Sequence, residues 1–429
     1  MPCEITKTCF PAQTIEKKGR MSFDATSRKL VGFLACKTKM KTEDFIVEEI
    51  TDLKILNATN SGPYYVYRMQ KEGWNTVDAL IRLAKENRIS LRDIQYGGKK
   101  DRHGITEQFI TSRSRLRLPA SLEGAVQLME LGRSQEPMAP GRIVGNRFKL
   151  WLRSLQASEI SHLQRNFEAI KEYGYINYFD SQRFSTFDRE EGLPAFALYA
   201  GNYEQALKML LLGTFRREKS HAKDRKAELL KSWGRWDACL QKADTAVERR
   251  VFAFLKESQR RAPADFAGAL DLLPFEELLM MLSAFQAFLW NHLVSNHIER
   301  HANGRAALFK TRTGILAFPA PGDQSIALDQ ELCLPGKDER FSPEFQADLQ
   351  SLLAQLGLPD NCTQISFLRS AAMNAYMRRM GILPGDLQLG LPEDDEMEAK
   401  RKKVELTFTL PAGAYGTMLV KRLTLRARF

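Results

Sequence analysis

One loop of the sequence, Tyr96-Gly-Gly-Lys-Lys-Asp-Arg-His-Gly-Ile-Thr106, carries a single carboxylate among cations and glycines. Asp101 follows Lys99 and Lys100 and precedes Arg102, and the glycines on both sides let the backbone bend. Neighbouring cations favour the ionised carboxylate, which suits a nucleophile or base that works beside a polyanion. The alternative is that Asp101 is a turn residue that caps a backbone group.

Other kinds of active site find little support in this chain. Signatures of a nucleophilic serine, a P-loop or a dinucleotide site are missing, and residues 97–100 lack the Walker spacing. His292 and His297 are five residues apart with no acidic residue between them, so we expect no metal site and no metal cofactor. The six cysteines form no C-x-x-C pair, which predicts free thiols in a reducing compartment. Pairing of Cys3 with Cys9 is the less favoured alternative.

The composition bounds the class of protein. The chain has 429 residues, of which 44% are hydrophobic, so it can form two or three folded domains. Its net charge of +11 favours an anionic partner such as nucleic acid, although a moderately basic soluble protein is the alternative. We find no apolar run long enough for a membrane span and no apolar signal core at the N-terminus. We therefore expect a cytoplasmic protein without a membrane partner.

The two ends of the chain carry strand patterns. These are Phe45–Ile50, Tyr64–Met69, Phe148–Leu152 and Val404–Leu410. Thr76 is predicted to cap a helix after the second strand, and a short helix should follow the last strand. Because strands at both ends surround a helical middle, we expect an α+β fold. Its twisted, mainly antiparallel mixed sheet would be flanked by helices and interrupted by an α-rich insertion.

The middle of the chain is rich in leucine and alanine from about residue 188 to 300. The predicted helices are Tyr203–Leu212, Ala227–Trp233, Phe275–Ser295 and, further along, Pro343–Leu356. Residues 313–343 contain many prolines and glycines and are expected to be irregular. The acidic run Glu393–Glu396 and the basic run Lys400–Lys403 predict solvated loops.

Seven segments resemble, in the same order, the motifs of the TruD family of RNA pseudouridine synthases. They are Lys39–Glu49, Lys71–Thr76, Gly98–Thr106, Gly145–Phe148, Asn177–Phe184, Ser283–Asn291 and Leu410–Thr417. Two positions depart from the family pattern: Thr42 stands where proline is common, and Asp180 replaces the usual glycine. One such segment would be weakly specific, whereas seven in order are specific to the family.

The resemblance implies isomerisation of uridine to pseudouridine in RNA, most simply in tRNA, by one aspartate without a cofactor. That aspartate corresponds to Asp101, which could attack the uracil ring, attack the sugar anomeric carbon, or act as a base toward the sugar. Lys39 matches the basic residue that keeps the aspartate ionised. Phe148 matches the aromatic residue that packs on the flipped base, and Asn146 matches its polar companion. Bacterial members act on uridine-13 of certain tRNAs, which is the expected target if this chain resembles them.

The residues expected to bind RNA come from the same motifs. They are Phe45, Lys71, Asn75, Lys99, Lys100, Arg102, Gln182 and Arg183. For Gln182 and Arg183 the alternative is a purely structural role. A basic cluster could also bind phosphates, although a mixed-charge helix face is the usual explanation. Its members are Arg216, Arg217, Lys219, Lys223, Arg225 and Lys226.

The resemblance also implies a division into domains. We expect an N-terminal arm over residues 1–30, a pseudouridine synthase catalytic domain over 31–180 and 380–429, and an α-rich TRUD insertion domain over 181–379. The alternatives are a non-catalytic RNA-binding protein on the same scaffold and a helical-repeat interaction protein, which the lack of a third repeat disfavours. A monomer is the expected state.

Overall fold

The computed structural model describes residues 29–52, 61–188, 190–214, 218, 220–323, 326–364, 368 and 371–427. The arm expected over residues 1–30 lies outside these ranges except for its last two residues. Cys3, Cys9, Arg216, Arg217 and Lys219 also lie outside the described residues.

The chain forms two compact units. One, the sheet unit, comprises residues 31–178, 320–330 and 380–429. The other, the helical unit, includes residues 179–319 and 331–379. The short segment 320–330 therefore packs with the sheet unit, whereas the sequence placed it in the insertion. The division into functional domains stays a prediction.

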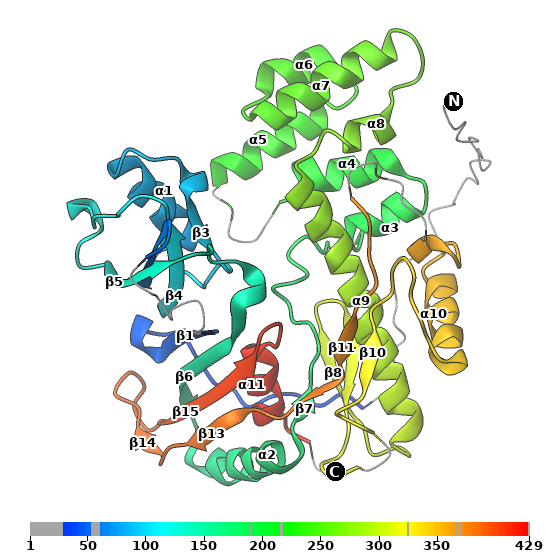
Figure 1. Ribbon diagram of the computed structural model, residues 1–429. Helices are drawn as coiled ribbons and strands as arrows, with labels where there is room; N and C mark the ends of the chain where they lie inside the picture. Colours follow the sequence, from blue (N-terminus) through cyan, green and yellow to red (C-terminus); the bar gives the residue numbers. More distant parts are fainter. Residues whose placement is uncertain are drawn as a thin grey trace. The chain divides into compact units, whose positions relative to one another are not determined.

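A nine-stranded sheet organises the sheet unit (Figure 1). Its strands are β1 (Phe45–Thr51), β2 (Tyr64–Glu72), β3 (Ile94–Tyr96), β4 (Ile105–Ser112), β5 (Val126–Ser134), β6 (Ile143–Leu155), β13 (Gly385–Leu389), β14 (Glu393–Asp394) and β15 (Lys402–Pro411). Seven strands follow the order β13-β15-β6-β1-β4-β2-β5, while β14 pairs with β15 and β3 with β4. Strands β1 and β4 are parallel, and the other described pairs of this sheet are antiparallel. The predicted mainly antiparallel mixed sheet is confirmed.

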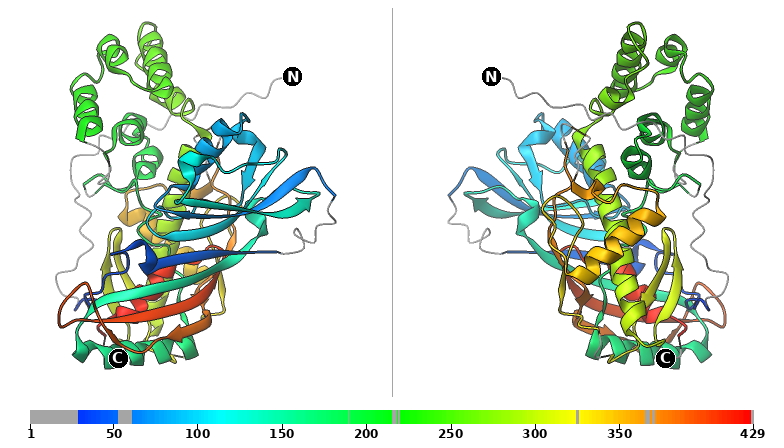
Figure 2. Two further views of the ribbon diagram at one scale, coloured as in Figure 1. Left: turned by 90° about the vertical axis from the view of Figure 1, so that its left-hand side faces the viewer. Right: turned by 90° about the vertical axis from the view of Figure 1, so that its right-hand side faces the viewer.

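Strand β15, from the end of the chain, lies between β13 and β6. Figure 2 shows β6 and β15 side by side over most of their length. The register aligns Phe408 with Phe148 and Leu410 with Asn146. Buried residues alternate along β15 because successive side chains of a strand point to opposite faces. Both ends of the chain therefore build one sheet, as the alternating pattern at 404–410 predicted.

Three helices and one small strand pair complete the sheet unit. They are α1 (Thr76–Glu86), α2 (Ile160–Tyr173) and α11 (Gly416–Thr424), with β7 (Tyr175–Ile176) paired to β12 (Gly381–Ile382). Asn75, not Thr76, is the N-cap of α1, because its side chain accepts a hydrogen bond from the Val77 amide. The apolar face of α1, including Leu80 and Leu83, packs into a buried cluster with residues of β2 and β4. This packing fixes the start of α1 against the two strands.

The helical unit contains eight described helices and two strand pairs. They are α3 (Pro194–Tyr199), α4 (Tyr203–Leu212), α5 (Ser220–Lys231), α6 (Trp236–Lys242), α7 (Ala246–Gln259), α8 (Phe266–Leu270), α9 (Phe275–His301) and α10 (Pro343–Gln355), with β8 (Ala307–Thr311) paired to β9 (Gly314–Phe318) and β10 (Glu331–Cys333) paired to β11 (Met377–Arg379). Most of the described residues over 313–343 are irregular, as expected, but β9 and β10 also lie in this segment. Apart from Gly314, the first residue of β9, its glycines and prolines lie outside these two strands.

Helix α9 is the core helix of the helical unit. It starts where the sequence predicted and continues six residues further, to His301. By length and composition α9 could cross a membrane, contrary to the expectation of no such run. However, 83% of its most apolar 18-residue window is buried inside the protein. Such burial is typical of a helix that is apolar all round and forms a domain core.

The acidic run at 393–396 is not a solvated loop as predicted. Its first two residues form β14, and the next two carboxylates pair with the buried guanidinium of Arg153. Arg153 donates to Asp395 at 2.9 Å, to Glu396 at 2.9 Å and to Asp44 at 2.8 Å. A buried arginine needs such partners because an unpaired charge would be costly away from water. The acidic residues therefore close the sheet edge around Arg153.

Candidate active site

The loop that carries Asp101 connects β3 to β4 and passes very close to β1. Gly104 has a φ of +140°, and a Cβ atom there would lie 2.4 Å from the carbonyl oxygen of Phe45. A larger residue would therefore have to move the loop or the strand. Glycine at this position allows the loop to approach the start of β1, where Phe45 lies with the Lys39 ammonium over its ring.

Asp101 and Lys39 form the central ion pair of this site. The Lys39 ammonium lies 2.7 Å from the Asp101 carboxylate, although the two residues are 62 positions apart. The same ammonium lies 3.6 Å from the centroid of the Phe45 ring. About a third of each charged side chain is exposed, so the pair remains accessible to a substrate. A cation in contact with a carboxylate stabilises its ionised form.

Lys71 lies beneath the loop rather than on the surface. Its side chain is 1% exposed, and its ammonium donates to the carbonyl oxygens of Asp101 at 2.7 Å and Trp74 at 2.8 Å. The carbonyl oxygen of Lys100, at 3.5 Å, is a third and weaker acceptor. Burial lowers the pKa of Lys71 to about 8, although the charge of Asp101 opposes the shift. This placement does not fit the direct RNA contact that we expected, because the three N–H groups of the ammonium have backbone acceptors.

Two more buried side chains fix the loop backbone. The Thr76 hydroxyl accepts a hydrogen bond from the Lys100 amide at 2.9 Å and donates to the Gln108 side chain at 2.9 Å. The Gln108 amide in turn donates to the Gly98 carbonyl oxygen at 3.3 Å. With Lys71, these residues hold the loop from β2, α1 and β4. Asp101 is therefore presented on a rigid support, which is what a reacting carboxylate requires.

Lys100 turns inward, unlike its neighbour Lys99. Its ammonium lies 2.8 Å from a carboxylate oxygen of Glu49, which is fully buried, and donates to the Asn146 side chain at 2.6 Å. Glu49 and Asn146 are directly opposite each other in the pairing of β1 with β6. The other Glu49 oxygen accepts from the Phe109 amide at 3.2 Å. Lys100 therefore links the loop to the sheet, which does not fit the phosphate contact expected for it.

Aromatic rings from three neighbouring strands, β1, β6 and β15, lie beside the ion pair. Phe148 stacks on Phe408 with centroids 4.9 Å apart and meets Phe45 edge to face at 6.4 Å. The strand registers account for this arrangement, since β6 lies between β1 and β15. Phe148 remains partly exposed, which leaves ring surface for stacking on a base.

The remaining RNA-binding candidates of the sheet unit lie on the surface. Lys99, Arg102 and Asn75 are all exposed. Arg102 donates to the carbonyl oxygen of Gly73 at 3.2 Å, and Asn75 caps α1. Exposed cations beside Asp101 can meet phosphates, because this contact needs no deep pocket.

Gln182 and Arg183 belong to the helical unit, so their expected place beside Asp101 stays a prediction. Arg183 lies 5.6 Å from the centroid of the Phe179 ring, and Gln182 is exposed.

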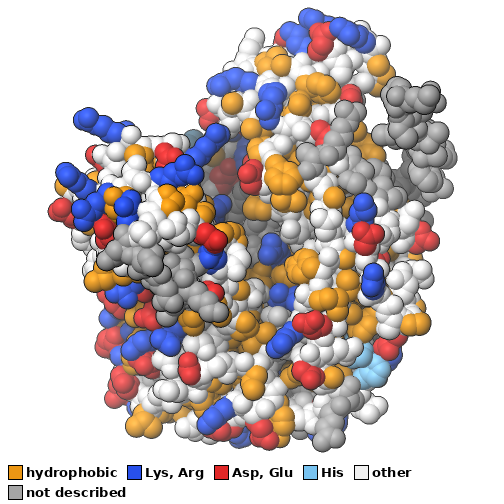
Figure 3. Space-filling model, viewed as in Figure 1, with side chains coloured by type: hydrophobic (Ala, Val, Ile, Leu, Met, Phe, Trp, Pro, Cys, Tyr) orange, Lys and Arg blue, Asp and Glu red, His pale blue; other side chains and the backbone are white. Residues whose placement is uncertain are grey.

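The described members of the basic cluster largely have acidic partners. Arg225 pairs with Glu248 at 2.9 Å and Lys226 with Glu218 at 2.7 Å. Figure 3 shows Lys and Arg side chains interleaved with Asp and Glu over the helices at the top of the view. This pattern fits the mixed-charge explanation better than a dedicated phosphate site.

The sequence did not predict several residues that build the site. Glu49, Gln108 and Phe408 are buried residues of strands, and Thr76 was expected only as a helix cap. For Glu49 and Gln108 the available signal was a polar residue at a strand position where the pattern calls for an apolar one. Such positions need a buried partner, but the sequence does not identify it.

The arrangement can perform chemistry with one carboxylate. Asp101 is ion-paired and partly exposed, Glu49 is buried and paired, and aromatic rings stand alongside. Within the described ranges, the cluster of side chains suited to a metal lies in the helical unit, not at Asp101. A single fixed carboxylate suits nucleophilic or base catalysis.

Comparison with known proteins identifies the family. The model of the family described as tRNA pseudouridine synthase D (TruD) matches residues 31–312. The tRNA pseudouridine synthase D of Leptospira interrogans is 39% identical over 402 residues, which cover 92% of this chain and 98% of that protein. The protein of the same name from Aquifex aeolicus is 26% identical and covers 90% of this chain and 97% of its own length.

A solved structure shares the fold. The crystal structure of a TruD protein from Methanosarcina mazei matches with a TM-score of 0.66 and 21% identity, over 92% of this chain and 94% of that one. The family model and the Leptospira relative both extend over most of the chain and include the loop of Asp101. The chain therefore belongs to the tRNA pseudouridine synthase D (TruD) family.

Proposed function

We propose that this protein isomerises uridine to pseudouridine in tRNA and that Asp101 is the reacting carboxylate. Membership of the TruD family supports the activity. The observation that carries the residue assignment is the 2.7 Å contact of Asp101 with Lys39 on a loop held by buried side chains. The expected role of Asp101 thus has a geometric basis as well as a motif.

The reaction is an isomerisation, so it consumes no second substrate. The bond between N1 of uracil and C1′ of the ribose breaks, and a bond between C5 and C1′ forms. C5 loses a proton, and N1 gains one. The Asp101 carboxylate could add to the uracil ring, attack C1′, or take a proton from the sugar. In each case it must be ionised at the start, and the Lys39 ammonium favours that state.

The other side chains of the site would position the substrate. The target base has to leave its stack, which costs a few kcal/mol. The exposed part of the Phe148 ring would receive the base, and the Asn146 amide, held by Lys100, would offer a polar contact. Lys99 and Arg102 would hold the adjacent phosphates. Uridine-13 as the target is the part of the proposal that rests on the resemblance. A cytoplasmic location, expected from the unpaired cysteines, and a monomeric state are further parts of the proposal.

The test uses purified protein and a defined tRNA transcript, with pseudouridine detected by carbodiimide labelling and primer extension. Wild type should form one pseudouridine at position 13, and a transcript with cytidine there should not be modified. Asp101→Asn keeps the shape of the side chain and should abolish the reaction while tRNA binding persists. Full activity in Asp101→Asn would refute the catalytic assignment. A wild-type protein that binds tRNA but isomerises none would instead be a non-catalytic RNA-binding protein.

A further inference from the structure

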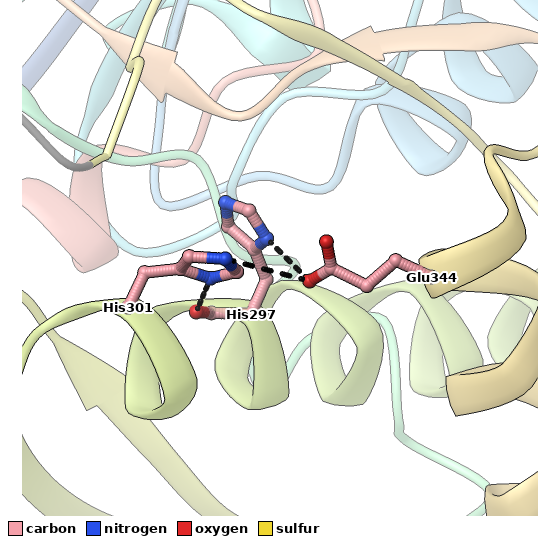
Figure 4. Close-up of side chains that lie close together, drawn as sticks. All are labelled: His297, His301 and Glu344. Carbon is pink, nitrogen blue, oxygen red and sulfur yellow. Dashed lines mark hydrogen bonds and ion pairs between the residues drawn. The ribbon is translucent and has the colours of Figure 1, made fainter.

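A group of possible metal ligands lies in the helical unit, outside the site described above. Figure 4 shows the imidazoles of His297 and His301, from the last turns of α9, beside the carboxylate of Glu344 in the first turn of α10. The two histidines are four residues apart, so they lie on one face of the helix. The Glu344 Oε1 atom lies 3.3 Å from His297 Nδ1 and 3.8 Å from His301 Nε2. One nitrogen of each ring and one carboxylate oxygen all lie within 4.8 Å of one another.

The hydrogen bond of His301 orients its ring toward this group. Its Nδ1 lies 2.9 Å from the His297 carbonyl oxygen, which can only accept, so a neutral ring carries its proton on Nδ1. The unprotonated Nε2 then faces the Glu344 oxygen, which is also an acceptor. Both atoms can serve as ligands to a cation, and the Glu344 oxygen also contacts the Arg300 guanidinium. A histidine that donates its second nitrogen to a backbone carbonyl is the usual orientation of a metal ligand.

The charges around the group also favour a cation. Arg300 contacts both Glu344 and Asp348, so one guanidinium faces two carboxylates. Asp348 is only 8% exposed, and its Oδ2 atom has no hydrogen-bond partner in the part of the chain that the structure describes. A buried carboxylate oxygen without a partner is costly. With neutral histidines the cluster carries a net charge of −1, which a bound cation would offset.

We propose that His297, His301 and Glu344 bind a divalent transition-metal ion, with zinc as the best fit. The ligand atoms would be Nδ1 of His297, Nε2 of His301 and Oε1 of Glu344, and water would complete the coordination. Two imidazoles and one carboxylate form a common zinc ligand set, whereas magnesium and calcium prefer oxygen ligands. Such an ion would link the end of α9 to the start of α10. This inference does not depend on the proposed function.

The sequence contains a signal for this group at a spacing other than that of His292 and His297, the pair from which no metal site was expected. His292 is in fact buried in the core of the helical unit, 3.2 Å from the Thr313 carbonyl oxygen, and burial lowers its pKa to about 4. The pair at a spacing of four is His297 with His301. Glu344 lies 43 residues beyond His301, so only the fold reveals the third ligand.

The experiment is a titration of the full-length, metal-free protein with zinc ions in competition with a chromophoric chelator. Wild type should bind one equivalent. His301→Ala should weaken binding by at least the 10–100-fold that loss of an outer-shell partner typically costs. Arg300→Gln removes a cation that competes for Glu344 and should strengthen binding. The control is His221→Ala, since His221 is an exposed histidine of α5 and should not matter.

Cobalt(II) gives a second measurement, because its visible absorption reports nitrogen ligands and the coordination geometry. Wild type and His221→Ala should give the same spectrum, and His301→Ala should lose it. The proposal is refuted if wild type binds no zinc in competition with the chelator. It is also refuted if His301→Ala binds zinc as tightly as wild type, because the site would then lie elsewhere. Circular dichroism of His301→Ala would show that the variant is folded.

Discussion

Replacement of Lys71 by methionine tests whether this residue holds the catalytic loop or contacts RNA. The change keeps an unbranched side chain of similar length but removes the buried ammonium. Two close contacts disappear, at 2.7 Å to the Asp101 carbonyl oxygen and at 2.8 Å to that of Trp74. Each hydrogen bond from a charged group contributes about 1.5–3 kcal/mol. Since methionine avoids the burial of a charge, we expect a net loss of roughly 2–4 kcal/mol in the stability of the loop.

The effect on catalysis should appear in kcat. A shift of about 1 Å in a reacting group can lower a rate by about 100-fold, so kcat should fall by this order in Lys71→Met. The Kd for tRNA should stay the same, because the Lys71 side chain is only 1% exposed. The matched control is Lys99→Met in the same loop, which removes an exposed cation and should weaken tRNA binding with little change in kcat. Single-turnover kinetics with filter binding separate the two quantities.

The pH dependence gives an independent check of Lys71. Burial lowers its pKa to about 8, so the ammonium loses a donor as the pH rises through that value. The rate of isomerisation should therefore fall above about pH 8 in wild type, and this decrease should be absent in Lys71→Arg. The stability of the folded protein should instead increase with pH, whereas the rate falls. The unfolded chain binds the Lys71 proton more tightly, so this residue makes the free energy of unfolding rise between about pH 8 and 10.5.

Two results would refute the role assigned to Lys71. One is a Lys71→Met variant with wild-type kcat and weakened tRNA binding, which would place the ammonium on RNA. The other is an alkaline loss of activity that persists unchanged in Lys71→Arg. Urea unfolding of each variant shows whether the loss of activity reflects the loop alone or the whole sheet unit.

Three further predictions concern the sheet unit. Gly104→Ala should lower kcat strongly, because the new Cβ would lie 2.4 Å from the Phe45 carbonyl oxygen. If the variant kept the kcat of wild type, the loop could move without cost. Arg153→Met should lower the free energy of unfolding in urea by about 3–5 kcal/mol, because it leaves the buried carboxylates of Asp44 and Asp395 unpaired. A decrease below about 1 kcal/mol would mean that these carboxylates are solvated. Burial raises the pKa of Asp395, but backbone hydrogen bonds and the Arg153 guanidinium outweigh it and hold the pKa below its usual value. This group therefore adds stability above about pH 4, and that stability is lost on acidification. Asp395→Asn should flatten the decrease in the free energy of unfolding, measured at several pH values.

The sequence alone was sufficient for the features that depend on local pattern. The alternation at 404–410 identified β15, because successive side chains of a strand point to opposite faces. The length of the apolar segment after residue 274 identified α9, because strands are much shorter. The motif around Asp101, with the order of the other motifs, was sufficient for the family. The pairing of Asp101 with Lys39, expected from the resemblance, has a counterpart in the 2.7 Å contact.

Only the tertiary structure decided which charged residues point inward. Lys71 and Lys100 have the same sequence character as Lys99, yet they lie under the loop and against Glu49, while Lys99 is exposed. The partners of Arg153 are more than 100 residues away on either side. The reason is physical: a charged side chain is buried only where partners from other strands or helices compensate its charge. Those partners are set by strand register and helix packing, which no local pattern in the sequence contains.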